Sequence, residues 1–109
     1  MTFSATYSAT EPERAEVDKA SDPVVLEFGS ATCGFCRAAQ PAIAAALADH
    51  AGVRHIKVAD GRGRPLGRTF GVKLWPTLVF IKEGKEVARL VRPYEAGPIR
   101  QALAKIDGR

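Results

Sequence analysis

Apolar runs and helical stripes alternate along the chain. Residues 24–28 form an apolar run of strand-forming residues that contains one carboxylate, Glu27. Such a run is typical of a central strand buried on both faces of a sheet. A further strand is predicted over 53–59, and the alternation of apolar and small polar residues over 3–7 predicts a short edge strand. Strands over 77–81 and 86–91 form a predicted hairpin with its turn at 83–85.

Helices are predicted between these strands. Thr10 opens a Thr-Glu-Pro-Glu pattern, which reads as a capping box with proline in the first turn and predicts a helix to about Ala20. The alanine-rich stretch 33–50 predicts a long helix, kinked at Pro41 and stopped by Gly52. A short helical piece ends at 70–71, and a last helix opens at 97–98. The apolar stripe of that last helix is Ile99, Ala102, Leu103 and Ile106.

The element order is therefore β-α-β-α-β-α-β-β-α. The early crossovers require parallel strands and the late hairpin is antiparallel. The sequence predicts an α/β fold with a mixed sheet flanked by helices on both faces. A length of 109 residues is the size of one domain, so we expect a single domain over 1–109.

Composition excludes several classes of protein. The chain is 46% hydrophobic and 26% charged, which disfavours disordered and low-complexity chains. The longest apolar stretch, 41–48, is far too short for a membrane span, which needs about twenty residues. Residues 1–20 contain no apolar stretch of the kind that a secretory leader has. We expect a monomeric cytoplasmic protein without a membrane-bound part.

The net charge of the chain is slightly positive, and the charged residues are unevenly distributed along the sequence. The formal net charge is +4, and six of the basic residues fall between 54 and 73, with one acid, Asp60, among them. No aromatic pair accompanies them to stack on bases, so nucleic-acid binding is disfavoured. A solvated face that attracts acidic partners is the favoured interpretation. The six basic residues are Arg54, Lys57, Arg62, Arg64, Arg68 and Lys73.

The two cysteines carry the candidate chemistry. Both lie in the stretch Cys33-Gly34-Phe35-Cys36, so no structural disulfide ties distant parts of the chain together. A close pair in an intracellular protein is either redox-active or half of a metal site. Zinc needs two further ligands, and the chain offers only His50 and His55, so no metal and no other cofactor are expected.

The spacing of the two cysteines assigns them different roles. If the helix begins at Cys33, free backbone N–H groups and the helix dipole stabilise its thiolate, which is the nucleophile in disulfide exchange. Cys36 falls on the same helical face, one turn deeper and within disulfide reach. Cys33 would attack a partner's disulfide and Cys36 would resolve the mixed disulfide. The alternative is a pair of inert, packed core cysteines.

Glu27 is a second candidate, because a buried carboxylate is costly without a partner. It lies at the end of the strand that leads to the cysteines, so it can exchange a proton with Cys36, directly or through water. The alternative is a structural carboxylate paired with Lys57 on the neighbouring strand. The two interpretations are compatible.

Trp75-Pro76 is a third candidate, just before the apolar strand over 77–81. Pro76 is a candidate for a cis peptide bond in a tight turn. If it faces the cysteines, the Trp75 backbone can pair with an extended substrate and its ring can supply an apolar contact. A core tryptophan before a trans proline is the equally weighted alternative.

Together these residues resemble the thioredoxin family from about Phe3 to Ile106. Cys33-Gly34-Phe35-Cys36 resembles its Cys-X-X-Cys motif, and Pro41 matches its helix-kinking proline. Glu27 stands at the position of its buried aspartate, and Trp75-Pro76-Thr77 resembles its cis-proline loop. The resemblance implies the thioredoxin fold, with Cys33 as nucleophile, Cys36 as resolving cysteine and Pro76 as a cis proline beside them.

Departures from the family concentrate on the surface that faces substrates. Thr32 replaces the usual tryptophan, Phe35 the usual proline, and Trp75 a small aliphatic residue. Arg92 follows the last strand where the family has glycine. Thr32, Gly34, Phe35 and Trp75 are thus candidate substrate-binding residues.

Two functions from different classes follow. The leading prediction is a thiol–disulfide oxidoreductase that acts on protein disulfides as a reductant, with a thioredoxin-reductase-type electron donor. The alternative is a peptide-binding module with little turnover, which would not need both cysteines. A glutaredoxin-type enzyme is disfavoured, because no glutathione-carboxylate site is recognisable.

Overall fold

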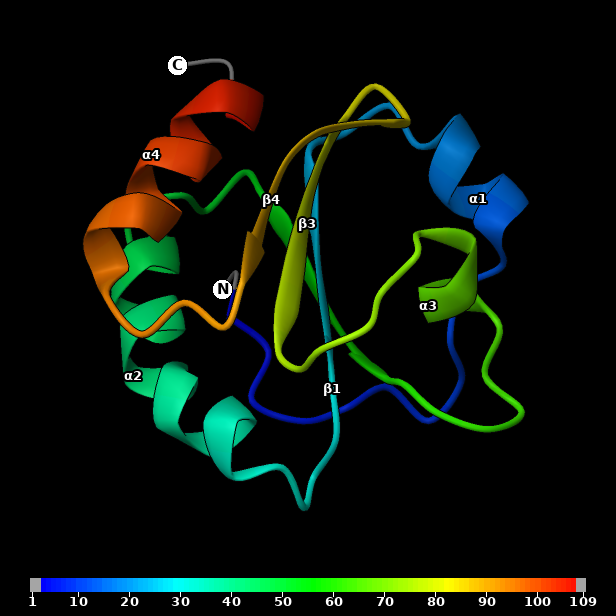
Figure 1. Ribbon diagram of the computed structural model, residues 1–109. Coiled ribbons are helices and arrows are strands. Elements are labelled where there is room, and N and C mark those ends of the chain that lie inside the picture. Colours follow the sequence, from blue (N-terminus) through cyan, green and yellow to red (C-terminus); the bar gives the residue numbers. More distant parts are fainter. Residues whose placement is uncertain (1–2, 108–109) are drawn as a thin grey trace.

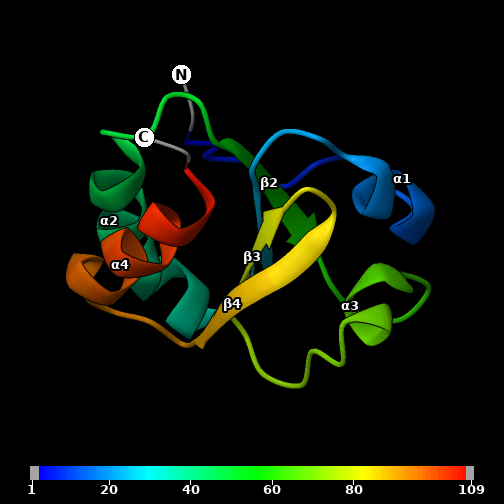
Figure 2. The ribbon, with the colours of Figure 1, turned by 90° about the horizontal axis from the view of Figure 1, so that it is seen from above.

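The computed structural model describes residues 3–107. It contains the strands β1 (Val24–Gly29), β2 (Arg54–Ala59), β3 (Thr77–Lys82) and β4 (Lys85–Val91). The helices are α1 (Arg14–Lys19), α2 (Gly34–Leu47), α3 (Leu66–Thr69) and α4 (Ala96–Ile106) (Figure 1). The strands form one mixed sheet in the order β2-β1-β3-β4. Helices α2 and α4 cover one face and α1 and α3 the other (Figure 2), so the predicted architecture is confirmed.

Strand β1 is central in the sheet and buried along its whole length. It pairs with β2 in parallel, as the crossover through α2 requires, and with β3 in antiparallel. Strand β3 is antiparallel to β1 because the connection from β2 to β3 stays at the end of the sheet where β1 and β2 finish. The register therefore pairs Phe28, near the end of β1, with Thr77, at the start of β3.

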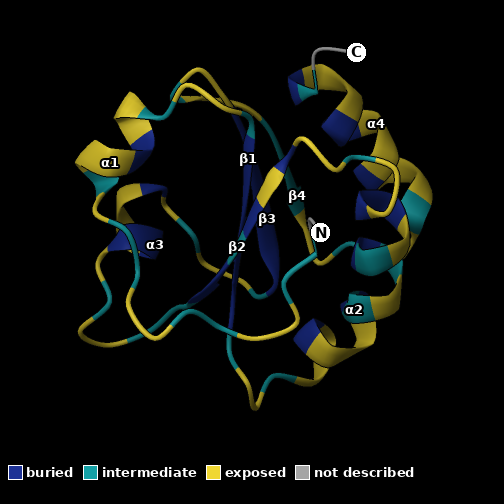
Figure 3. Cartoon of the chain, turned by 180° about the vertical axis from the view of Figure 1, so that it is seen from behind, coloured by how far each residue is buried: buried dark blue, intermediate teal, exposed yellow. Residues whose placement is uncertain are grey.

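Two apolar clusters, one on each face of the sheet, hold the helices in place (Figure 3). The larger lies under α2 and α4, where the predicted stripe Ile99, Ala102, Leu103 and Ile106 is buried. The smaller lies under α1 and α3, around Phe28 and Leu66. Pro41 lies within α2 at an exposed position.

The predicted edge strand over 3–7 is wrong. This segment lies beside β2, but side chains rather than a backbone ladder hold it. The Ser4 N–H donates to Nδ1 of His55 over 2.8 Å, and Nζ of Lys57 donates to the carbonyl of Ala5 over 3.1 Å. One backbone bond, from the Ser8 N–H to the Lys57 carbonyl, comes just after the predicted strand.

Helix boundaries differ by a few residues from the predicted ones. The capping box is formed by Glu13 and Glu16 rather than by Thr10, so α1 begins at Arg14. The Glu16 carboxylate accepts the Glu13 N–H over 3.1 Å. Helix α2 ends at Leu47, before Gly52, and its last turn still packs in the larger cluster through Ala46 and Leu47.

The hairpin turn between β3 and β4 consists of Glu83 and Gly84, both at positive φ, 50° and 78°. Two such residues are what a tight type I′ turn requires, since its twist matches that of the strands. The predicted hairpin is therefore present, with its two-residue turn at the end of the sheet opposite the cysteines.

Candidate active site

The cysteines and the proline turn meet because of the strand register. Strand β1 leads through Gly29 to Cys33, and β3 begins directly after Pro76. Since Phe28 pairs with Thr77, both segments leave the sheet at the same end. The Trp75–Pro76 peptide bond is cis, and Pro76 is buried.

Cys33 is the N-cap of α2, so the helix begins one residue after the predicted start. Its backbone is extended, at φ −85° and ψ 118°, and its Sγ accepts the backbone N–H of Cys36 over 3.1 Å. The thiol is half-buried, so a partner's sulfur can reach it. A sulfur that takes the place of a capping oxygen lies where helix N–H groups stabilise negative charge.

Cys36 lies one helical turn deeper and is only 1% exposed. Burial raises the pKa of its thiol to about 11, and a hydrogen bond with Cys33 acts in the same direction. A backbone hydrogen bond at Ser30 and a hydrogen bond with the Tyr7 hydroxyl lower it. Cys36 is therefore a thiol at neutral pH and must lose its proton before it can attack.

Tyr7 is a site residue that the sequence analysis missed. It comes from the segment before α1 and reaches Cys36 past Gly29. A Cβ on Gly29 would lie 2.6 Å from Cys36 Sγ and 2.9 Å from the Tyr7 hydroxyl, so only glycine fits here. The signal in the sequence was a glycine directly after a buried strand, which often marks a close approach.

Glu27 is fully buried and has two hydrogen-bond partners. Its Oε1 lies 2.8 Å from Nε2 of His55, and its Oε2 accepts from Nε2 of Gln40 over 2.8 Å. Because His55 Nδ1 accepts the N–H of Ser4, the proton of the neutral ring is on Nε2 and donates to Glu27. The same amide nitrogen of Gln40 also donates to the Cys36 carbonyl over 2.8 Å.

The predicted pairing of Glu27 with Lys57 is wrong. Lys57 is opposite Glu27 in the register, but its Nζ donates to Oε1 of Gln40 over 3.0 Å and to the Ala5 carbonyl. Gln40 thus lies between the two charges, and a histidine takes the predicted role of the lysine. The ammonium also lies 4.5 Å above the Tyr7 ring.

A cavity of about 520 Å³, here called the rear cavity, lies beside Tyr7, Cys36 and Gln40. It reaches Cys36 and does not include Cys33. Its lining residues are Ala5, Thr6, Tyr7, Ser30, Ala31, Cys36, Arg37, Gln40 and Lys57.

A second group, here called the front rim, comprises Phe35, Trp75 and Arg92. The Arg92 guanidinium lies 4.1 Å above the Phe35 ring, and its Nε donates to the Trp75 carbonyl over 2.9 Å. Arg92 adopts φ +54°, the left-handed region that glycine takes without cost. Its backbone N–H donates to the Pro76 carbonyl over 2.7 Å, and these contacts offset the strain.

The structure brings Phe35 and Trp75 together through Arg92, and it leaves Phe35 59% exposed. Trp75 is half-buried, and its indole N–H donates to Asp60 over 2.9 Å. Thr32 and Gly34 are both exposed, and the hydroxyl of Thr32 lies 3.1 Å from that of Ser30.

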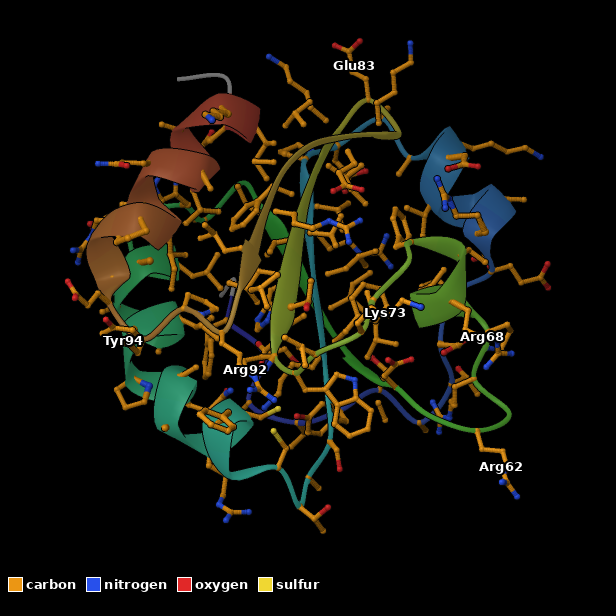
Figure 4. All side chains as sticks on the ribbon, viewed as in Figure 1. Arg62, Arg68, Lys73, Glu83, Arg92 and Tyr94 are labelled. Carbon is orange, nitrogen blue, oxygen red and sulfur yellow. The ribbon has the colours of Figure 1, made fainter. Side chains whose placement is uncertain are left out.

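The predicted basic face is smaller than expected. Lys57 is only 4% exposed and belongs to the rear cavity. Arg62, Arg68 and Lys73 are exposed and extend outward on the side of the molecule that carries α3 (Figure 4).

Within residues 3–107, no cluster of three His, Cys, Asp or Glu side chains is placed to hold a metal ion. Over the same part of the chain, none of the helices has the length and apolar character needed to cross a bilayer.

This architecture, with two thiols one turn apart at the start of a helix and a cis proline beside them, defines a thioredoxin-fold protein equipped for disulfide chemistry. The family model for thioredoxin matches residues 6–105. The chain belongs to the thioredoxin family.

Individual proteins similar to this chain are also thioredoxins. Thioredoxin 2 of Pseudomonas aeruginosa PAO1, solved in its reduced form, superposes with a TM-score of 0.85 and 48% identity, over 97% of this chain and 98% of that one. The TPR repeat-containing thioredoxin TDX of Arabidopsis thaliana is 29% identical over 90% of this chain and 26% of its own length. Thioredoxin H2 of the same plant is 30% identical over 70% and 57%. The chain thus spans about a quarter and somewhat over half of these two relatives.

Proposed function

We propose that the protein is a thiol–disulfide oxidoreductase that exchanges the Cys33–Cys36 pair with disulfides of other proteins, mainly as a reductant. The observation that carries this proposal is the geometry of the pair. Cys33 is accessible at the N-cap of α2, and Cys36 is buried within hydrogen-bond contact of it. Membership in the thioredoxin family supports the same activity.

The reaction takes two steps. Cys33 Sγ attacks one sulfur of the substrate disulfide, which breaks that bond, forms a mixed disulfide and releases the first substrate thiol. Cys36 Sγ then attacks Cys33 Sγ, which forms the Cys33–Cys36 disulfide and releases the second substrate thiol. The dithiol is oxidised by two electrons, the substrate is reduced by two, and both thiol protons end on the substrate sulfurs.

The surrounding residues have distinct proposed roles. Glu27 receives the Cys36 proton through water and passes it on toward the departing substrate sulfur, while Gln40 donates to Glu27 and to the Cys36 carbonyl and holds the carboxylate in place. Pro76 shapes the turn on which a substrate strand lies. Thr32, Gly34 and Phe35 contact the substrate around the reacting sulfur.

Trp75 has the most constrained role in substrate binding. Arg92 already donates a hydrogen bond to the Trp75 carbonyl. A substrate strand that pairs with the Trp75 backbone must therefore share this carbonyl with Arg92 or displace the Arg92 side chain. The exposed side chains Phe35 and Leu74 supply the apolar part of the surface, and the basic side chains near α3 attract acidic partners. This combination favours a narrow set of protein substrates.

The protein works as a monomer in the cytoplasm, where the thiol pool is reducing. It uses no cofactor besides the two cysteines, and a thioredoxin-reductase-type donor returns it to the dithiol. It binds neither nucleic acid nor membranes.

The test combines turnover with a redox titration. Reduction of insulin by dithiothreitol should be accelerated by the protein and not by Cys33→Ser. The potential of the pair should lie at or below the cytosolic glutathione poise of about −220 to −260 mV. A potential above about −180 mV would indicate an oxidant or isomerase. Peptide binding without any acceleration would favour the alternative of a binding module.

A further inference from the structure

The resolving step poses a physical problem that Glu27 does not solve by direct contact. Cys36 must become a thiolate in a buried site, where its pKa is raised to about 11. Both oxygens of Glu27 are engaged by His55 and Gln40. The charged form of Cys36 therefore needs a hydrogen-bond donor at its sulfur.

The Tyr7 hydroxyl occupies this place. Gly29 lacks a side chain where one would contact both Cys36 Sγ, at 2.6 Å, and the Tyr7 hydroxyl, at 2.9 Å. Tyr7 and Cys36 line the same cavity, and Lys57 Nζ lies 4.5 Å above the tyrosine ring and fixes its position. The Tyr7 hydroxyl thus lies near the reacting sulfur, where its hydrogen bond lowers the pKa of the Cys36 thiol.

We propose that Tyr7 is a further catalytic residue, whose hydroxyl donates a hydrogen bond to the Cys36 thiolate during the resolving step. This proposal rests on the proposed disulfide exchange and assigns a role within it. Tyr7 keeps its proton throughout, and the proton of Cys36 goes to the departing substrate sulfur, so the balance of the reaction is unchanged.

The mixed disulfide makes Tyr7 more important than it is in the resting dithiol. In the dithiol, a hydrogen bond with Cys33 and the charge of Cys33 both raise the Cys36 pKa. Once Cys33 Sγ is bonded to the substrate sulfur, both influences are removed. The backbone at Ser30 and the hydroxyl of Tyr7 then remain as donors to Cys36, and both favour its thiolate.

Tyr7 is suited to remain a donor over the whole working range of pH. Burial, followed by the charges of Cys36 and Glu27, raises the pKa of its phenol well above the ordinary value of 10.0. The other titratable or charged groups around the pair are Cys33 and Arg37 on the α2 side and, from the sheet, Glu27 with His55 and Lys57.

The size of the effect follows from two opposing trends. Loss of the hydroxyl raises the Cys36 pKa, and each unit of pKa leaves about tenfold less thiolate at neutral pH. A thiolate of higher pKa is also more nucleophilic, by roughly threefold per unit. We therefore expect Tyr7→Phe to slow the resolving step about three- to tenfold.

The test uses dithiobis(nitrobenzoic acid), which releases one coloured thiol when Cys33 attacks and a second when Cys36 resolves. Tyr7→Phe retains the ring that faces the Lys57 ammonium and removes only the hydroxyl. The first release should keep its wild-type rate, which also shows that the variant is folded. The second should be slower, and its rate should continue to rise to higher pH than in the wild type. The matched control is Tyr94→Phe, at a tyrosine 77% exposed and outside the rear cavity (Figure 4), which should change neither release.

The outcomes separate the two proposals. A second release with the wild-type rate and pH profile, or equal slowing of both releases, would overturn the role of Tyr7. A wild-type protein that releases no second thiol would instead overturn the disulfide exchange itself.

Discussion

At the front rim, the chain presents exposed side chains next to a half-buried thiol, whereas at the rear cavity it encloses a thiol that is 1% exposed. Cys33 accepts a helix N–H, and Cys36 has a pKa raised to about 11 by burial. One turn of helix is enough to create this difference, because residues three apart share a face at different depths. The comparison shows how one short motif supplies both an accessible nucleophile, Cys33, and a buried resolving thiol, Cys36, that a partner's disulfide cannot reach directly.

The largest effect should come from removing one thiol at a time. With Cys36→Ser, mixed disulfides between Cys33 and substrates should accumulate, because the rear thiol that resolves them is missing. With Cys33→Ser, no covalent complex should form. Non-reducing electrophoresis after exposure to a disulfide substrate measures both, and equal trapping by the two variants would erase the distinction between front and rear.

Glu27→Gln has the next largest expected effect and tests proton transfer at Cys36, beside the rear cavity. The new amide nitrogen faces either the His55 N–H or the amide nitrogen of Gln40, and either contact places donor against donor. We expect the resolving step to slow by up to about 10²-fold at neutral pH, which is the lower end of the range usual for a lost proton-transfer group. Stopped-flow release of the second thiol measures this, and an unchanged rate would reduce Glu27 to a structural residue.

Trp75→Ile tests the front rim. Truncating an aromatic anchor costs about 2 kcal/mol or more, so KM for a captured protein partner should rise roughly thirtyfold. Turnover of a small aromatic disulfide should change little, because it does not span the rim. The matched control is Val87→Ala on β4, an exposed apolar residue near the far end of the sheet. If KM for the protein partner is unaffected by Trp75→Ile, the rim does not select substrates.

Much of the fold could be predicted from the sequence because its signals are local. The apolar run around Glu27, the stripe ending at Ile106 and the turn at Glu83-Gly84 each correspond to an element of the structure. The strand predicted over 3–7 was wrong although apolar and polar residues alternate there as in a strand. Its backbone groups bind the side chains of His55 and Lys57 instead of a neighbouring strand.

The site was predictable only where its residues adjoin in sequence. Cys33 and Cys36 follow from their spacing at a helix start. The contacts of Tyr7 with Cys36 and of His55 with Glu27 join residues far apart in the chain, and no local pattern encodes them. The sequence shows that Arg92 stands where the family has glycine. Its hydrogen bond to the Trp75 carbonyl was not predictable, because it accompanies a positive φ that arginine does not favour.

The division between front and rear thiols is tested most directly by the alkylation rates of Cys33 and Cys36, resolved by mass spectrometry across pH. Iodoacetamide reacts with thiolates, so a buried thiol with a raised pKa is protected until the pH is high. Cys33 should react first at neutral pH, and Cys36 should become reactive only as the pH approaches about 11. Equal rates at neutral pH, or faster reaction at Cys36, would contradict the account.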